Sequence, residues 1–412
     1  MRREDVQPLL VQAADRLPEP DLADVAWAAG VQSSRRRRRL VVLGVIAFIV
    51  GAIVASILIE VGTSGNADIT PPPNPPGYVE ASGKISGIDF WVAPPPGSER
   101  FLDRLETPLG DRLELPDKVR PLAKHTLDSV AAVVLVKQGD RYAPVLLGGD
   151  GSWAQADIGL VPVGGESPLS PGAVSPYGRI VAFPQPGELI TVNATTAEIS
   201  HFPLPGGGEF RSVSWVQDEQ RVLVSGSGAA YQVVVGEGGD GEQAVIQVSA
   251  TNDPAEVTAP YRIQTGAVMR YLFNGRWMED SPLTLPVRSW QGQTMSSNTA
   301  AARVFVAEKL PEVPTRVSQP QVLAAISTLR TLPSRLLVLG EPQDNPPTYE
   351  GAGDRPFVRE AGCCVVLGWY DDSNVLFRVH GWVLAWNLET GRVRRVTEMR
   401  VDQVALGPGL RL

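Results

Sequence analysis

The sequence predicts an all-β body in which short antiparallel strands alternate with tight turns, preceded by a short N-terminal membrane anchor. Three observations predict this class. Glycine and proline are frequent, with 41 and 36 residues among 412, as in proteins that have many turns. β-Branched runs, such as Ser129–Lys137 and Tyr142–Leu147, recur between turn residues. A meander of such runs is repeated at three places along the chain.

Each repeated segment contains a polar turn, a short β-run, a turn around glycine and another β-run. The first two segments are 41 residues apart, measured from Val174 to Trp215. A step of about 40 to 50 residues with about four short strands is the period of a β-propeller blade. The segments are VSPYGRIVAFPQPGELITVNATTAEISHFPLPG from Val174 to Gly206, SWVQDEQRVLVSGSGAAYQVVV from Ser214 to Val235, and GWYDDSNVLFRVHGWVLAWNLETGRVRRVTEM from Gly368 to Met399.

A ring of such blades protects its own sheet edges, so we predict a β-propeller with six or seven blades. Two motifs, SPYGR before a β-run and NLETGRVRRVT at the end of the third segment, resemble the extracytoplasmic bacterial propellers related to WD-repeat and TolB-like proteins. The resemblance implies the blade fold and no activity. The chain departs from the WD-repeat pattern, because no blade ends in Trp-Asp or opens with Gly-His. A pair of β-sandwiches is the alternative architecture.

Two strand candidates, Lys84–Val92 and Val401–Leu406, remain outside the repeats, and we expect them to pair and close the ring. Two other segments interrupt the β pattern. Ser318–Gln321 has the spacing of a helix capping box before an apolar stripe, which predicts a short inserted helix that ends before Pro333. Glu341–Gly362 is rich in proline, glycine and charge, which predicts a long surface loop.

The segment Leu40–Val61 has 22 residues with no charge before Glu60, enough for a helix to cross a membrane. A buried core helix and a cleaved signal peptide are the alternatives, and neither suits so long an apolar run. Arginines precede the segment and the next basic residue is Lys84, so the N-terminus is predicted to be cytoplasmic. A twin-arginine export signal is a weaker match. The topology signal consists of Arg35, Arg36, Arg37, Arg38 and Arg39.

The predicted organisation is a short helical cytoplasmic tail at 1–39, a single transmembrane helix at 40–61, a proline-rich stalk at 62–77 and an extracytoplasmic propeller at 78–412. The tail has two short helical patterns, each too short to be stable alone in water. It either docks a cytoplasmic partner or serves as a weakly structured leader. The expected location is therefore the cell membrane, with the body outside the cytoplasm.

The formal net charge of −8 is unevenly distributed along the chain. Residues 1–39 carry eight arginines and six acidic residues, a sum of +2, and Glu60 adds −1, so the remaining body carries −8 − 2 + 1 = −9. An acidic body has no electrostatic reason to bind nucleic acid. The only basic block is explained by the membrane, so nucleic acid is excluded as an expected partner.

Cys363 and Cys364 are the only cysteines, and they are adjacent. They form either a vicinal disulfide or a pair of small reduced residues in a buried strand, and burial of cysteine is common enough to favour the second interpretation. A redox switch is a third interpretation, which the local sequence does not favour because no basic or histidine neighbour lowers a thiol pKa.

No catalytic residue, cofactor-binding residue or metal ligand is predicted, because the three histidines are far apart and no nucleophile or phosphate-loop motif occurs. Aromatic residues gather between Tyr261 and Trp290, either as an exposed ligand platform or, as we favour, as filling between blades. Core packing is also the preferred role of four tryptophans within the repeats. They are Trp215, Trp369, Trp382 and Trp386.

Two functions from different classes follow from this organisation. The first is a non-catalytic binding or scaffold protein that presents a propeller to an envelope protein or glycan. The alternative is a cell-envelope hydrolase, acting on glycan or peptide from the central channel, which would need paired carboxylates or a nucleophile with its base. We favour binding, because no motif in the sequence points to chemistry.

Overall fold

The structure is a computed structural model, and it describes residues 74–215, 220–226, 228–235, 245–248, 261–264, 267–271, 277–282, 284–308, 320–327, 333–343, 358–360 and 363–411. All of them belong to one compact unit, Pro73–Leu412. The predicted tail, membrane span and most of the stalk lie outside the described residues. Within those ranges, no helix has the length and apolar character needed to cross a membrane.

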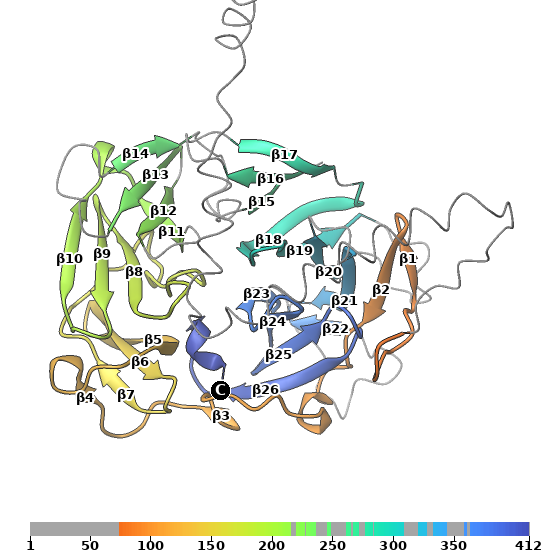
Figure 1. Cartoon of the computed structure of the whole chain (residues 1–412), viewed down its shortest axis with the longest axis horizontal. Helices are drawn as coiled ribbons and strands as arrows, with labels where there is room; N and C mark the ends of the chain where they lie inside the picture. Colours follow the sequence, from red (N-terminus) through yellow and green to blue (C-terminus); the bar gives the residue numbers. More distant parts are fainter. Residues whose placement is uncertain are drawn as a thin grey trace, which may run out of the picture. The chain divides into compact units, whose positions relative to one another are not determined.

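The body is an all-β propeller, and its described strands form six sheets arranged around a common centre (Figure 1). The predicted number of six or seven blades concerns the complete ring, which includes residues outside the described ranges, and it stays a prediction. All three repeated segments are confirmed as antiparallel meanders. They form β8 to β10 (Ile180–Gln185, Glu188–Asn193, Ile199–Pro203), β11 to β13 (Phe210–Trp215, Arg221–Gly226, Ala229–Val234) and β23 to β26 (Val365–Trp369, Asn374–Val379, Trp382–Asn387, Val393–Met399).

The remaining sheets contain strands that the sequence patterns did not group. β14 (Val245–Val248) adds to β13. A further sheet has the order β15-β16-β17, and another contains β18 to β21. The bounds are Tyr261–Gln264, Ala267–Tyr271, Trp277–Pro282, Val287–Ser296, Ala300–Ala307, Gln321–Ser327 and Arg335–Gln343 for β15 to β21, and Val130–Gln138, Arg141–Gly148 and Trp153–Gln155 for β5 to β7.

The apolar core is divided among the gaps between neighbouring sheets. Strands such as β19 (AAARVFVA) are buried along their whole length, because both faces of a blade pack against adjacent blades. One cluster joins β19 to β21 with β23 to β25, and another joins β23 to β26 with β5 and β6. Continuous apolar runs, rather than a strict alternation, therefore mark the central strands of this fold.

The N-terminal part of the body, residues 88–121, forms a belt along the outer edges of three sheets (Figure 1). Each of its three pairings is parallel: β2 (Ile88–Val92) with β21, β3 (Arg112–Leu113) with β26, and β4 (Arg120–Pro121) with β7. In chain order, the sheets of β21 and β26 are the last two of the ring, and the sheet of β7 is the first. The belt therefore joins the sheets between which the ring closes.

The predicted pairing of the N-terminal and C-terminal strands, which was expected to close the ring, is wrong. The candidate Lys84–Val92 is two strands, β1 (Gly83–Ile85) and β2, because Ser86 and Gly87 turn the chain at φ values of 50° and 80°. β2 pairs with β21, and the C-terminal strand β27 (Ala405–Leu406) pairs with β5. The C-terminus thus supplies the innermost strand of the first sheet, while the N-terminal strands lie outside.

The predicted helix after Ser318 is also wrong, because Gln321–Ser327 forms β20 in the middle of its sheet. Its first six residues are buried, so the apolar run VLAAI fills both faces of a strand. A short apolar run fits helical and strand spacing equally well, and the tertiary environment selects the strand. The predicted loop Glu341–Gly362 begins inside β21 and contains β22 (Val358–Glu360), which pairs with β21; residues 344–357 lie outside the described ranges.

Equivalent turns confirm that the first and third segments are repeats in three dimensions. Oδ1 of Asn193 accepts hydrogen bonds from the backbone of Thr195 and Thr196. Oδ1 of Asn387 accepts the equivalent bonds from the backbone of Glu389 and Thr390. The last turn residue has a positive φ in both, 60° at Ala197 and 72° at Gly391. The shared Asx geometry explains why the sequence motif is repeated.

Candidate ligand pocket at one end of the last sheet

The antiparallel order of the last sheet brings three chain segments together at one of its ends. β23 begins, β24 ends, β25 begins and β26 ends there, because neighbouring strands run in opposite directions. The segments are Cys363–Cys364, the His380–Gly381 turn and Arg400–Asp402. A backbone hydrogen bond of 2.8 Å from Met399 to Gly381 ties the turn to the end of β26.

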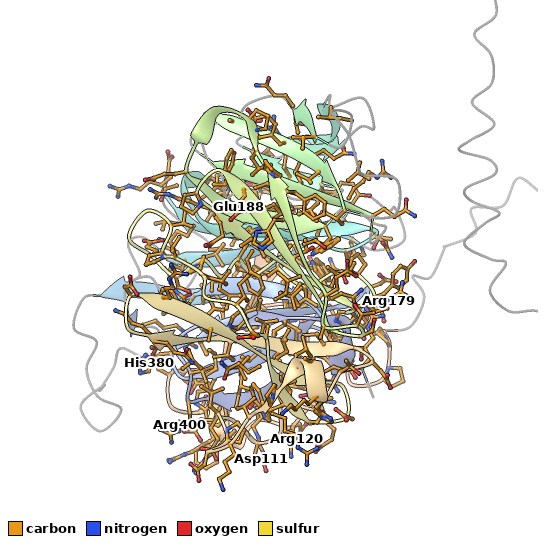
Figure 2. The ribbon with its side chains drawn as sticks, turned by 90° about the vertical axis from the view of Figure 1, so that its left-hand side faces the viewer. Asp111, Arg120, Arg179, Glu188, His380 and Arg400 are labelled. Atoms are coloured by element: carbon orange, nitrogen blue, oxygen red, sulfur yellow. A yellow bond between two sulfur atoms is a disulfide. The ribbon has the colours of Figure 1, made fainter. Side chains whose placement is uncertain are left out.

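These segments line an open pocket of about 600 Å³. Half-buried Trp382 and buried Cys363 contribute apolar surface to a lining that is otherwise mainly polar. Figure 2 shows His380 and Arg400 toward one side of the body and Arg179 toward the opposite side. The charged or titratable lining residues are Arg378, His380, Glu398, Arg400 and Asp402.

Glu398 is held at the pocket by two guanidinium groups. Its Oε2 accepts a hydrogen bond from Nε of Arg112 at 2.8 Å, and its Oε1 lies 2.6 Å from Nη2 of Arg400. Arg112 belongs to β3, so the belt supplies part of the charge behind the pocket. In the register of β25 and β26, Glu398 lies directly opposite Trp382. Because both carboxylate oxygens are in ion pairs, Glu398 is suited to positioning arginines rather than to proton transfer.

Arg378 connects the pocket to the loop that leads toward β27. Its Nη1 donates a hydrogen bond of 3.0 Å to the backbone oxygen of Asp402. The side chain of Asp402 is exposed at the rim. The guanidinium therefore fixes the loop while it contributes positive charge to the pocket wall.

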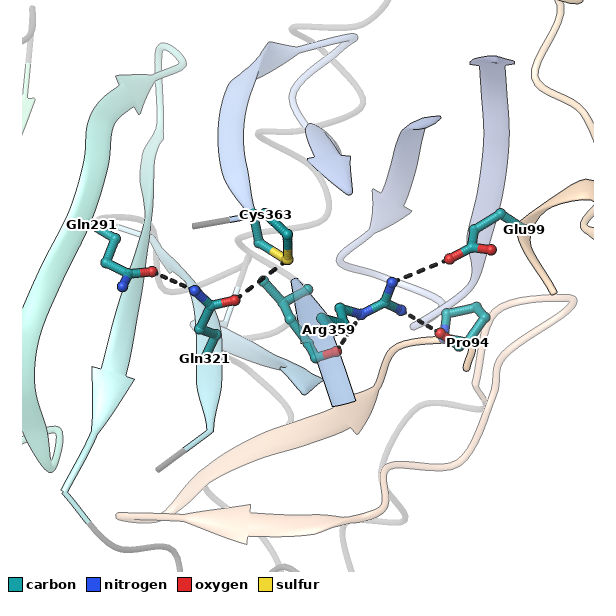
Figure 3. Close-up of a disulfide and its surroundings, with 8 residues drawn as sticks. Pro94, Glu99, Gln291, Gln321, Arg359 and Cys363 are labelled. Carbon is teal, nitrogen blue, oxygen red and sulfur yellow. Dashed lines mark hydrogen bonds and ion pairs between the residues drawn. A yellow bond between two sulfur atoms is a disulfide. The ribbon is translucent and has the colours of Figure 1, made fainter. Parts of the chain in front are cut away.

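A disulfide joins Cys363, which lines the pocket, to Cys364 (Figure 3). Both residues are buried, with 7% and 1% exposure, as the reduced-pair interpretation required, but they are bonded rather than reduced. Sγ of Cys363 lies 3.5 Å from Oε1 of Gln321, a contact and not a hydrogen bond because a disulfide sulfur carries no hydrogen. Nε2 of Gln321 donates to Oε1 of Gln291 at 2.6 Å. The side chain that contacts Cys363, Gln321, is therefore held by a hydrogen bond to Gln291.

A buried ion pair lies near the disulfide and anchors the belt (Figure 3). Nη1 of Arg359 lies 3.1 Å from Oε1 of Glu99, and both side chains are less than 5% exposed. Arg359 also donates to the backbone oxygens of Leu339 and Pro94 at 2.6 and 2.5 Å. Burial lowers the pKa of the Arg359 guanidinium, and the charge of Glu99 opposes this shift. The charges are therefore paired and hydrogen-bonded, as burial requires.

The three histidines lie on different elements of the body. His380 lines the pocket, whereas His201 lies 3.1 Å from a carboxylate oxygen of Glu188 on another sheet. His125 follows the short 3-10 helix Leu122–Lys124. In the part of the chain that the structure describes, no three histidine, cysteine or acidic side chains are grouped to hold a metal ion.

The aromatic predictions have mixed outcomes. Tyr261 is buried in an apolar cluster that joins β15 to β19, β20 and β21, and partly buried Trp290 packs against the same cluster, which supports packing between sheets for these two residues. The side chains at 271, 273 and 277 lie outside the described residues. Trp386 and Trp215 are buried, as predicted. Trp369 and Trp382 are only half-buried.

The centre of the ring contains a polar contact between sheets that are not consecutive. Nε2 of Gln293 in β18 donates a hydrogen bond of 3.2 Å to the backbone oxygen of Val213 in β11. Oγ of Ser170 lies 2.8 Å from Oε1 of Gln293 and donates to the same Val213 oxygen at 3.0 Å. Ser170 and Gln293 are both buried. These hydrogen bonds link β11, β18 and the loop that carries Ser170.

Sequence reasoning missed the pocket because its residues lie in three separate places: before β23, around the turn between β24 and β25, and at the end of β26. Trp382 was predicted as core, His380 was considered only as one of three histidines far apart in the sequence, and Arg378 and Arg400 were not selected. Only the order of strands within the third segment carries a signal. Residues that precede the first strand, join the second and third, and follow the fourth must lie at the same end of a meander.

No family model matches the chain, and no curated protein matches it. Among solved structures, the chain is similar to TolB from Acinetobacter baumannii, with 14% identity, a TM-score of 0.37, and coverage of 68% of this chain and 66% of TolB, just under two thirds of its length. A nidogen–laminin complex matches with 11% identity, a TM-score of 0.36, and 67% and 98% coverage. AztD from Citrobacter koseri matches with 11% identity, a TM-score of 0.32, and 67% and 97% coverage. At these scores the likenesses carry no argument about function, and the propeller fold rests on the sheets described above.

Proposed function

We propose that the protein is a single-pass membrane protein whose extracytoplasmic propeller binds an envelope partner without catalysis. The membrane part rests on the apolar run 40–61 and on the arginines before it. The binding part rests on the pocket at the end of the last sheet, because it combines a cavity, an aromatic side chain and several charged groups. The pocket is the observation that carries the proposal.

The alternative of a hydrolase finds less support in the same residues. Glu398 has both oxygens in ion pairs with arginine, and buried Ser170 and Gln293 are hydrogen-bonded to the backbone of Val213 in β11. A general acid or nucleophile needs a carboxylate or hydroxyl that faces substrate. The observed roles of these groups are structural, so binding is the function that the geometry favours.

The topology is tested in intact cells that express the full chain with an epitope at each end. Protease added from outside should remove the C-terminal epitope and leave the N-terminal one intact. Lysed cells, in which both epitopes become accessible, are the control. A C-terminal epitope that resists protease in intact cells and is lost only after lysis would contradict the proposed orientation.

Binding is tested by sedimenting the detergent-solubilised full chain with washed, insoluble envelope material. The chain should co-sediment, and Arg400→Gln should weaken co-sedimentation because it removes an exposed charge from the pocket. Arg120→Gln in β4, an exposed arginine outside the pocket lining, is the matched control. A wild-type chain that stays in the supernatant would contradict an envelope-binding role.

A further inference from the structure

We infer that the pocket at the end of the last sheet takes an acidic carbohydrate, a sugar that carries a carboxylate. This inference rests on the proposed binding function and names its ligand class. Three properties of the pocket support it: its size, its local charge and its aromatic wall. The argument uses only the pocket residues and the belt arginine behind them.

The size of the pocket suits a short saccharide segment. Its volume of about 600 Å³ falls inside the usual range of about 300 to 1,000 Å³ for small-ligand sites. The pocket is open to solvent at the end of the sheet, so a longer chain could enter with one or two units seated. An open site of this kind suits part of a polymer better than a fully enclosed small molecule.

Local charge opposes the charge of the body as a whole. The pocket lining has two arginines, Arg378 and Arg400, against two carboxylates, Glu398 and Asp402, and Arg112 adds a third arginine through its ion pair with Glu398. This group has a formal charge of +1, whereas the body from residue 62 onward has a formal charge of −9. A negatively charged ligand is therefore repelled by most of the body and attracted here.

Arg400 is the side chain best placed to hold a ligand carboxylate. Its side chain is 54% exposed, and its ion pair with Glu398 uses Nη2. A guanidinium carries five N–H donors in a planar fork that matches a carboxylate. Because Arg112 also holds Glu398, the fork of Arg400 can engage a ligand without leaving that carboxylate unpaired.

Trp382 and the disulfide give the pocket an apolar wall suited to a sugar ring. Trp382 is half-buried, packs against the apolar cluster of β19 to β25, and lies opposite Glu398 in the strand register, so an indole surface stands beside the charged groups. Sugars have apolar C–H faces and hydroxyls that both donate and accept hydrogen bonds. Arginines can donate to these hydroxyls and Asp402 at the rim can accept from them. A simple inorganic anion would use the charges and not the wall.

The inference is tested by calorimetric titration of the detergent-solubilised full chain with trigalacturonate. We expect saturable binding, with the neutral maltotriose at least about tenfold weaker because it lacks charge-assisted hydrogen bonds. Inorganic phosphate at the same concentration should not compete. The inference would be overturned if maltotriose bound as tightly as trigalacturonate. It would also be overturned if inorganic phosphate competed with trigalacturonate, or if a tri-glutamate peptide bound more tightly.

Variants locate the binding within the chain. Arg400→Gln and Trp382→Ala should each weaken trigalacturonate binding about tenfold or more, and Trp382→Phe should keep most of the affinity because it keeps an aromatic face. The matched controls Arg120→Gln and Trp153→Ala lie on other strands and should change it less than about twofold. Thermal unfolding verifies that each variant is folded, and Arg400→Gln tests the site if Trp382→Ala does not fold. Unchanged affinity in folded Arg400→Gln, with trigalacturonate bound by the wild-type chain, would place the site elsewhere and overturn the inference.

Failure of the inference is distinguishable from failure of the proposed function. If the wild-type chain sediments with envelope material but trigalacturonate does not bind, the ligand class is wrong and the binding role stands. If trigalacturonate binds but the body lies on the cytoplasmic side, the membrane part of the proposed function is wrong and the ligand class stands.

Discussion

The outer edges of the sheets fall into two groups, and the comparison explains what the N-terminal part of the body does. The outer strands β21, β26 and β7 each pair with a strand of the belt. In the described residues, β10 and β14 pair on one side only. An unpaired edge exposes backbone groups to other chains, so the two groups need different protection.

The uncovered β10 is protected by its own composition. It is short, ends at Pro203, and carries exposed His201 beside Glu188, all features that discourage pairing with another chain. The covered edges instead depend on tertiary contacts from a distant part of the sequence. Stability on the belted side should therefore respond strongly to single substitutions in the belt, and stability at β10 should respond weakly.

The largest effect is expected for Trp91→Ala in β2. Trp91 is 3% exposed, and it contacts Tyr78 and Trp386 edge-on at centroid distances of 6.5 and 6.2 Å. Its loss should lower the free energy of unfolding by about 3–5 kcal/mol, because a large buried ring leaves a cavity. Urea denaturation measures the change. Phe202→Ala in β10, which removes a partly buried ring, should cost clearly less; equal losses would contradict the comparison.

Glu99→Gln should be the next largest change. It removes the negative partner of the buried Arg359, whose remaining partners are the carbonyls of Leu339 and Pro94. We expect a loss of about 2–3 kcal/mol in the free energy of unfolding, because a buried charge is left without its counter-ion. The double variant Glu99→Leu with Arg359→Met should recover part of that loss. A double variant no more stable than Glu99→Gln would mean that the pair is not the cause.

The equivalent turns allow a test with a smaller effect, in which two substitutions should change the stability in opposite directions. A Cβ at Gly391 would meet Nε1 of Trp91 and would require a positive φ of 72°, so Gly391→Ala should destabilise by about 2 kcal/mol. Ala197→Gly in the uncovered sheet should instead stabilise by less than about 1 kcal/mol, since it relieves a φ of 60°. Thermal unfolding of both variants measures the difference. The same sign for both would show that the belt does not distinguish the two turns.

The smallest effect is expected at Asp150, in the turn between β6 and β7. Hydrogen bonds from the backbone and the hydroxyl of Ser152 lower the pKa of Asp150 below its ordinary value of 3.8. Its contribution to stability is therefore present above that value and is lost as pH falls through the folded pKa, in the window below pH about 4. Asp150→Asn should make acid unfolding less steep in that window. An unchanged slope would indicate that this turn does not contribute.

Local patterns in the sequence were sufficient to predict the meanders. Glycine and Asx turns between apolar runs specify where each hairpin folds, and the repeated motifs at Asn193 and Asn387 form the same turn in the structure. The all-β class and the acidic character of the body follow from composition alone. These features depend on neighbours within a few residues, so a single sequence contains them.

The errors lie where distant segments compete for one position. The run from Gln321 to Ser327 is compatible with a helix until β19 and β21 supply backbone partners on both sides. Lys84–Val92 contains a turn that leaves β2 free to pair with β21 rather than with the C-terminus. Parallel pairing across a large sequence separation leaves no local pattern, because its partners are chosen by the packing of the whole ring.

The sequence by itself therefore determined the kind of protein: a β-rich acidic body built from repeated meanders, behind an apolar segment flanked by arginines. Only the tertiary structure decided the belt, the strand that closes the ring, and the pocket formed by Trp382, Arg378 and Arg400. The physical reason is distance along the chain. Turns and strands are stabilised by near neighbours, whereas edges and pockets form where segments hundreds of residues apart, such as Arg112 and Glu398, meet.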